Sequence, residues 1–292
     1  MLGRAACLRG LLPALPAFRP APRAGTPGVQ RRATGAAVAL LAALLSLAAC
    51  APGAVPSSAP VAAVPQAPTR WHAILVAGDP SLPVWDNAVE RFARSMPDAA
   101  SSRRFSAAGR PGAAPATIPN VLQTIAALRP GPGEGCLVFL TMHGAPGRGL
   151  AFVQSNQTLG PGPFQSALSR GCGDAPTVVV ASGCYTGSFA PALAAPNRVV
   201  LTAARADRPS FGCGAGYTYT VFDSCLLDAL DANAPRGWTA VSDATLACVA
   251  AEEARLRERP SEPQRSITPA LAGEPIRWAP APSSAAGAGG KR

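Results

Sequence analysis

The chain has 292 residues, enough for one sizeable α/β domain with extensions at its ends. It carries 26 basic and 16 acidic side chains, but residues 1–49 hold six arginines and no acid, so the remainder is only slightly basic. No basic patch with interleaved aromatic residues occurs, so the composition does not support nucleic-acid binding.

The first predicted element is an export signal. Arg31-Arg32 precedes an apolar stretch over 36–47, which is too short to be a convincing transmembrane helix. Leu47-Ala48-Ala49-Cys50 resembles a bacterial lipobox, in which Cys50 is acylated and becomes the mature N-terminus. We therefore expect a leader over 1–49 and a lipid anchor at Cys50. The alternative is an ordinary signal peptide cleaved nearby, with Cys50 unmodified.

Proline-rich residues 50–70 predict an extended tether, residues 71–278 a single domain, and low-complexity residues 279–292 a disordered tail. Strands that alternate with helices predict a largely parallel sheet with right-handed crossovers. In chain order, the domain is expected to contain a strand (71–77), a helix (84–96), a polar connection (99–116), a helix (118–128), a strand (136–141), a hairpin (150–153 with 157–159), a helix (164–170), two strands (177–181 and 198–202), two helices (221–230 and 240–259) and a short last strand (276–278).

Two of the apolar strands lead to residues suited to catalysis. The strand over 177–181 leads to Cys184, and the strand over 136–141 leads to His143. Because ligands of open α/β sheets lie beyond the carboxyl ends of the strands, we expect thiol and imidazole at the same edge of the sheet. A cysteine nucleophile with a histidine base requires this arrangement. The alternatives are a buried structural cysteine and a histidine satisfied in the core or a loop.

The surroundings of Cys184 favour the catalytic interpretation. A helix that begins just after Cys184 would direct backbone N–H groups at the thiol and lower its pKa. Gly183 would leave room for a substrate backbone. The chain's other histidine, His72, lies at the opposite end of its strand. The pairing of the remaining cysteines cannot be read from the sequence, although an exported protein is free to form disulfides.

These residues also carry a resemblance to a known family. His143-Gly144 and Ser182–Phe189 resemble the two catalytic motifs of the legumain-type cysteine peptidases, family C13 of the caspase-like clan. Further segments resemble this family in the expected order, including its bacterial members: Trp85–Val89, Thr202–Cys213 and Ser261–Gln264. The resemblance implies a caspase/hemoglobinase-like three-layer sandwich, in which a mostly parallel six-stranded sheet is flanked by helices.

The resemblance also implies an enzyme. A cysteine-type peptidase of this kind acts on a peptide or protein substrate through an acyl-enzyme, and no metal or organic cofactor is implied. The backbone N–H groups of Gly144 and Cys184 would form the oxyanion hole. Two alternatives remain open, namely an amide transferase (transpeptidase) that shares the acyl-enzyme, and a non-catalytic envelope lipoprotein that keeps the fold for binding. The expected location is the bacterial cell envelope, facing the periplasm.

The resemblance suggests a substrate pocket at Asp86, Asn87, Asp207 and Ser210. The asparagine-specific plant and animal members carry basic side chains where this chain has Asp86-Asn87, so we do not expect asparagine specificity. An acidic Asp86 would suit a basic or polar residue before the cut. The alternative is that Asp86 and Asn87 only cap the helix that follows them.

Overall fold

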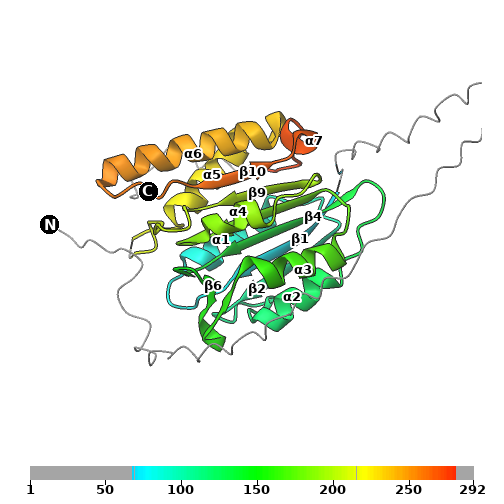
Figure 1. The fold of residues 1–292 in the computed structure, drawn as a ribbon, viewed down its shortest axis with the longest axis horizontal. Coiled ribbons are helices and arrows are strands. Elements are labelled where there is room, and N and C mark those ends of the chain that lie inside the picture. Colours follow the sequence, from blue (N-terminus) through cyan, green and yellow to red (C-terminus); the bar gives the residue numbers. More distant parts are fainter. Residues whose placement is uncertain (1–67, 69, 215, 281–292) are drawn as a thin grey trace, which may run out of the picture. The chain divides into compact units, whose positions relative to one another are not determined.

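The structure is a computed structural model that describes residues 68, 70–214 and 216–280. Cys50, the predicted leader and nearly all of the predicted tether therefore lie outside the described residues. The described part contains a seven-stranded sheet in the order β10-β9-β8-β4-β1-β2-β3 (Figure 1). Its strands pair in parallel except for the antiparallel pair of β10 and β9. The predicted largely parallel α/β fold is confirmed.

The elements have the following bounds. The strands of the large sheet are β1 (Arg70–Ala77), β2 (Ser101–Ser106), β3 (Ala114–Pro115), β4 (Glu134–Thr141), β8 (Thr177–Ser182), β9 (Arg198–Thr202) and β10 (Gln264–Ile267). A small antiparallel sheet consists of β5 (Gly144–Ala145), β6 (Gly149–Phe152) and β7 (Gln157–Leu159). The helices are α1 (Val84–Arg94), α2 (Ile118–Ala126), α3 (Pro161–Gly171), α4 (Phe189–Ala192), α5 (Val221–Asn233), α6 (Gly237–Leu256) and α7 (Pro269–Ala272).

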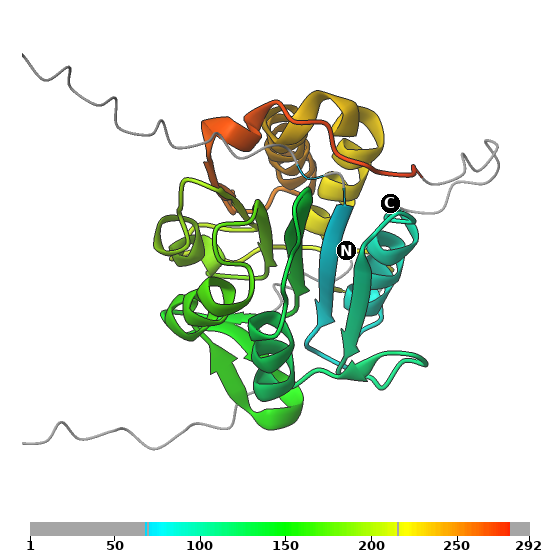
Figure 2. The same cartoon turned by 90° about the vertical axis from the view of Figure 1, so that its right-hand side faces the viewer.

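Helices lie on both sides of the large sheet (Figure 2). The sheet has a hydrophobic core on each face, because its central strands are buried on both sides. Alternate strand residues such as Leu75 and Phe139 pack with α1, α5 and α6. Their neighbours, such as Ile74 and Val138, pack with α2, α3 and α4. The sheet is thus the middle of three layers, and the helices fix the carboxyl ends of β1, β4 and β8 relative to one another.

Two sequence predictions at the edges of the sheet are wrong. The predicted connection over 99–116 contains β2 and β3, which extend the sheet on one side. β2 is polar because it lies next to the edge, where Ser102 and Arg103 are exposed. On the other side the last strand is β10, whereas the predicted strand over 276–278 packs on helices: Trp278 makes an edge contact with Phe92 of α1. The sheet therefore has seven strands rather than six.

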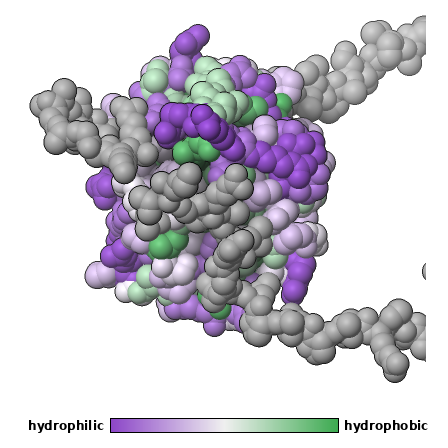
Figure 3. Space-filling model, turned by 90° about the vertical axis from the view of Figure 1, so that its left-hand side faces the viewer, coloured by the Kyte–Doolittle hydropathy of each residue, from purple (hydrophilic) through white to green (hydrophobic). Residues whose placement is uncertain are grey.

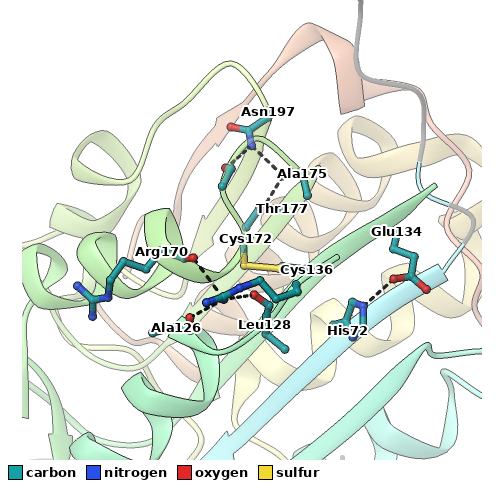
Figure 4. Close-up of a disulfide and its surroundings, with 12 residues drawn as sticks. His72, Ala126, Leu128, Glu134, Cys136, Arg170, Cys172, Ala175, Thr177 and Asn197 are labelled. Atoms are coloured by element: carbon teal, nitrogen blue, oxygen red, sulfur yellow. Dashed lines mark hydrogen bonds and ion pairs between the residues drawn. A yellow bond between two sulfur atoms is a disulfide. The ribbon is translucent and has the colours of Figure 1, made fainter. Parts of the chain in front are cut away.

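Two disulfides join pairs of cysteines within the described residues. Cys136 of β4 is bonded to Cys172, which follows α3 (Figure 4). Cys225 of α5 is bonded to Cys248 of α6. Disulfides form and persist in oxidising compartments, so this pairing is compatible with an exported protein. Cys184 is a free, buried thiol.

One face of the molecule shows how polar and apolar side chains are distributed on it. On the face shown in Figure 3, hydrophilic residues cover most of the visible surface and hydrophobic residues form small separate patches. Among residues 68–280, leaving aside the two that are not described, no helix is long and apolar enough to cross a membrane. The apolar sides of the helices instead face the sheet.

Candidate active site

His143 and Cys184 are brought together by the pairing of two neighbouring strands. Thr141 at the end of β4 is in register with Ser182 at the end of β8. The pairing continues one residue further, where the N–H of Met142 donates a 3.1 Å hydrogen bond to the carbonyl of Ser182. His143 and Cys184 each lie two residues beyond this paired row, at the carboxyl edge where the sequence predicts them.

The glycine after the histidine is required by close approach of two backbones. A Cβ atom at Gly144 would lie 1.8 Å from the carbonyl oxygen of Cys184 and 3.1 Å from its nitrogen. At Gly183, a Cβ atom would lie 2.7 Å from the carbonyl oxygen of Met142. The two catalytic loops are therefore in direct backbone contact, which brings the N–H groups of Gly144 and Cys184 into one neighbourhood.

A small cavity joins the two side chains. Its lining includes His143, Cys184 and Ser210, together with Trp85 and Thr220 from the segments on the other side. The cavity volume is about 10 Å³, room for roughly one water molecule. The ring of Trp85 contacts the imidazole edge to face at a centroid distance of 4.9 Å, and so limits its rotation.

A buried carboxylate lies behind the imidazole. Asp79, in the turn after β1, is completely buried, and its Oδ2 lies 3.8 Å from Nε2 of His143. Its Oδ1 accepts a hydrogen bond from the N–H of Ser81 at 2.8 Å, whereas Oδ2 has no hydrogen-bond partner. The negative charge of Asp79 stabilises the protonated ring and so opposes the effect of burial on the pKa of His143. The sequence prediction missed Asp79, although its place just past a buried strand was a usable signal.

The thiol of Cys184 contacts Ser210 rather than the imidazole. The N–H of Ser210 donates to Sγ at 3.3 Å, and the thiol lies 3.6 Å from the carbonyl oxygen of Ser210. Burial raises the pKa of the Cys184 thiol, and hydrogen bonds from Ser210, Cys184 and Gly144 oppose this shift. The expected lowering of this pKa is therefore wrong. The residues after Cys184 form a 3₁₀ turn over Thr186–Ser188 and then only the four-residue α4, so no long helix begins at the thiol.

The imidazole is also favoured in its neutral form. Burial lowers the pKa of His143, and the negative charge of Asp79 acts in the opposite direction. The resting pair is therefore a neutral thiol and a neutral imidazole, so His143 is suited to act as a base that takes the thiol proton during attack.

The four predicted pocket residues occupy three different places. Ser210 lies at the thiol. Asp86 and Asn87 line a separate groove next to the catalytic cavity. Asp207 is exposed and forms a two-point ion pair with Arg205, which lowers its pKa to about 2. The structure therefore does not gather these residues into one pocket. Nor do Asp86 and Asn87 cap α1, since its N-terminus has no side-chain cap hydrogen bond.

His72 lies away from the catalytic edge, as expected from its place in β1. Its ring contacts Glu134 at 2.9 Å (Figure 4). The other ring nitrogen contacts Ser101 at 2.8 Å, so the ring links the amino-terminal ends of β1, β2 and β4. This is a structural role. Within the described ranges, no group of three or more His, Cys, Asp or Glu side chains is arranged to hold a metal ion.

The fold is that of a caspase-like α/β domain, with a thiol and an imidazole that line one cavity. The domain is similar to "Crystal Structure of Caspase-1 from Spodoptera frugiperda", with a TM-score of 0.51, 12% identity, and coverage of 76% of this chain and 96% of that chain. It is similar to "structure of pro-sf-caspase-1", with a TM-score of 0.50, 13% identity, and coverage of 73% and 94%. At this identity the likeness shows the fold alone.

The sequence comparison is more specific. Residues 120–250, a segment that contains both His143 and Cys184, match the model of the Peptidase C13 family. No curated protein matches the chain. The family match and the caspase-like fold support a cysteine-peptidase-type or related function.

Proposed function

We propose that the domain is a cysteine peptidase in which Cys184 is the nucleophile and His143 the general base. The observation that carries the proposal is the cavity lined by both side chains, next to the backbone contact of Gly144 with Cys184. The Peptidase C13 match supports the same reaction class. The substrate is a peptide or protein.

The reaction follows from the two neutral groups. His143 takes the proton of the Cys184 thiol as sulfur attacks the peptide carbonyl, and the N–H groups of Gly144 and Cys184 stabilise the oxyanion. The tetrahedral intermediate expels the amine, which takes the proton from the imidazolium and leaves an acyl-enzyme. Water, activated by His143, then hydrolyses the thioester. Asp79 stabilises the imidazolium that exists between the two proton transfers.

Labelling and kinetics test this proposal together. A thiol-directed acyl probe should label the native protein and should not label Cys184→Ala. Cys184→Ala and His143→Ala should each abolish turnover of a cleaved peptide, and the double variant should be hardly slower than either single variant, because the two residues act as one unit. His72→Ala is the matched control, because its ring lies at the opposite end of the sheet. Loss of activity in His72→Ala but not in His143→Ala would contradict the assignment.

We also propose that the protein is exported and anchored to the membrane through an acylated Cys50. The lipobox-like sequence before Cys50 motivates this proposal, and the two disulfides are compatible with it. Cys50→Ala should release the protein from the membrane fraction or stall its processing. Unchanged processing and unchanged membrane association of this variant would exclude the lipid anchor.

A further inference from the structure

We propose that the groove next to the catalytic cavity binds the cationic side chain of a basic substrate residue, and that Arg110 occupies this subsite when no substrate is bound. The inference rests on the proposed peptidase function and names its substrate class. It identifies one carboxylate, Asp86, as the group that recognises the substrate and one arginine as its resident competitor.

The groove is large enough for a side chain, and residues of its lining are sequence neighbours of residues that line the catalytic cavity. It has a volume of about 550 Å³ and lies between α1, the loop after β2 and the segment before α5. Two pairs of adjacent residues connect it to the catalytic cavity. Trp85 and Thr220 line the cavity of Cys184, and their neighbours Asp86 and Tyr219 line the groove. A residue held at Asp86 would therefore belong to a substrate that extends to the thiol.

Asp86 has the features of a ligand group rather than of a helix cap. Its side chain is almost completely buried, and its Oδ2 accepts no hydrogen bond. A buried carboxylate without a donor is costly, and such groups are ordinarily paired with a cation or hydrogen-bonded. Asp86 makes no capping hydrogen bond at the start of α1. Oδ2 of Asp86 is thus held at the wall of the groove without a hydrogen-bond donor.

The cation that now neutralises Asp86 is loosely held. Nε of Arg110 lies 3.5 Å from Oδ2 of Asp86, which is an ion pair without a good hydrogen bond. The Arg110 side chain is 45% exposed. Its loop contains Gly109 and Gly112, both with positive φ, a conformation that favours glycine. The backbone N–H of Arg110 donates a 3.2 Å hydrogen bond to Oγ of Ser106, so the loop stays attached to β2 when the side chain moves. A guanidinium or ammonium of a substrate can take the place of Arg110 without disturbing the core.

The other charges of the groove are either paired or distant. Glu90, one helical turn after Asp86, pairs with Arg104 of β2. Arg94 follows after another turn, so its backbone lies about 12 Å along the helix axis from that of Asp86. The acidic end of the groove is therefore the end next to the catalytic cavity. Asp86 is the carboxylate there whose present partner is readily displaced.

Matched fluorogenic peptides that differ only in the residue before the cut, Arg, Lys, Asn or Glu, test the subsite. The native enzyme should cleave the Arg and Lys peptides with the highest kcat/KM. Asp86→Asn should lower kcat/KM for these two peptides by about tenfold or more, with little effect on the Asn peptide. Arg110→Ala should lower KM for the basic peptides, because the competing cation is gone. Arg103 is an exposed arginine of β2 outside the groove, so Arg103→Ala is the charge control. It should change neither kcat/KM nor KM for any of the four peptides.

Two results would overturn the inference while peptidase activity remained: a kcat/KM indifferent to charge, or an Arg110→Ala variant with unaltered KM for every peptide. Peptide binding to an inactive variant tests the subsite independently of peptide cleavage. Inactive Cys184→Ala protein should bind the Arg peptide more tightly than the Glu peptide, and the added Asp86→Asn substitution should remove this difference. Equal binding of the two peptides would overturn the subsite. Absence of turnover together with absence of acyl-probe labelling at Cys184 would instead refute the proposed function.

Discussion

The carboxylate of Asp79 lies 3.8 Å from Nε2 of His143, on the side where its charge stabilises an imidazolium. It is completely buried in the turn that follows β1, so water screens this interaction little. The third side chain of the proposed centre therefore follows β1, the outer one of three neighbouring strands, β8, β4 and β1, whose carboxyl ends lie side by side.

Asp79→Asn should change both the rate and its pH dependence. The charge of Asp79 raises the pKa of His143 against the effect of burial, so its removal lowers this pKa further and moves the acid limb of kcat/KM to lower pH. At the same time kcat should fall, on the order of 10²-fold, because the imidazolium loses its counter-charge. A pH–rate profile measures both effects, and thermal unfolding checks the fold. If both the acid limb of kcat/KM and the value of kcat stay unchanged in Asp79→Asn, then Asp79 does not act on His143.

Gly144→Ala should disable the site through backbone displacement. The added methyl group would lie 1.8 Å from the carbonyl oxygen of Cys184, so the two loops must separate. We expect a loss of about 10²–10³ in kcat, as for an oxyanion-hole donor, and a destabilisation of about 1–3 kcal/mol. Gly162→Ala in α3 is the matched control, because nothing lies within 4 Å of its Cβ position. Full activity of Gly144→Ala would argue against an oxyanion hole at this contact.

Asp223 should make stability depend on pH. This carboxyl is completely buried in α5 and accepts a 2.6 Å hydrogen bond from Oγ1 of Thr141; burial raises its pKa from 3.8 to about 6. Between pH 3.8 and about 6 the Asp223 carboxyl is protonated in the folded protein and ionised in the unfolded chain. The free energy of unfolding should therefore fall by about 3 kcal/mol as pH rises from about 4 to about 6, and this contribution should stay constant above that.

Asp223→Asn removes the titration while leaving an oxygen for Thr141. Urea unfolding of both proteins at several pH values between 4 and 7 isolates the contribution, because all other groups are shared. The difference in unfolding free energy between the variant and the native protein should grow in favour of the variant as pH rises through this window. Parallel pH profiles would mean that Asp223 stays ionised.

Removal of the Cys136–Cys172 disulfide should reduce stability without affecting turnover. The bond closes a loop of 36 residues, and the double Cys→Ala variant should lose about 2–4 kcal/mol of unfolding free energy. Cys136 pairs in register with Thr177 at the start of β8, whereas His143 follows the other end of β4. Thermal denaturation and peptide turnover should therefore respond differently. A parallel loss of kcat at a temperature where the variant is folded would show that the disulfide also positions the catalytic loops.

The central elements of the fold could be predicted because burial leaves a strong pattern in the sequence. β1, β4, β8 and β9 are buried on both faces, so they form continuous apolar runs with little ambiguity. β2 and β10 lie toward the edges and contain serine and arginine, so their sequences resemble loops. Their strand conformation depends on a neighbour that already offers backbone hydrogen bonds.

The candidate site was predictable in position and not in electrostatics. Strand ends placed His143 and Cys184 at one edge, since that inference requires only the direction of parallel strands. The raised pKa of the Cys184 thiol depends on how tightly other segments close over it, and Ser210 lies 26 residues further along the chain. Asp79 was missed because Gly78-Asp79-Pro80 is also an ordinary turn sequence.

The enclosure of Cys184 also affects how long the nucleophile survives. Oxidation of a cysteine to sulfenic acid requires a thiolate and access for the oxidant. The Cys184 side chain is 2% exposed, and burial keeps its thiol protonated, so both requirements are suppressed in the free enzyme. The described chain can thereby hold a reduced cysteine and oxidised cysteine pairs in one domain, because burial protects the thiol that would otherwise react.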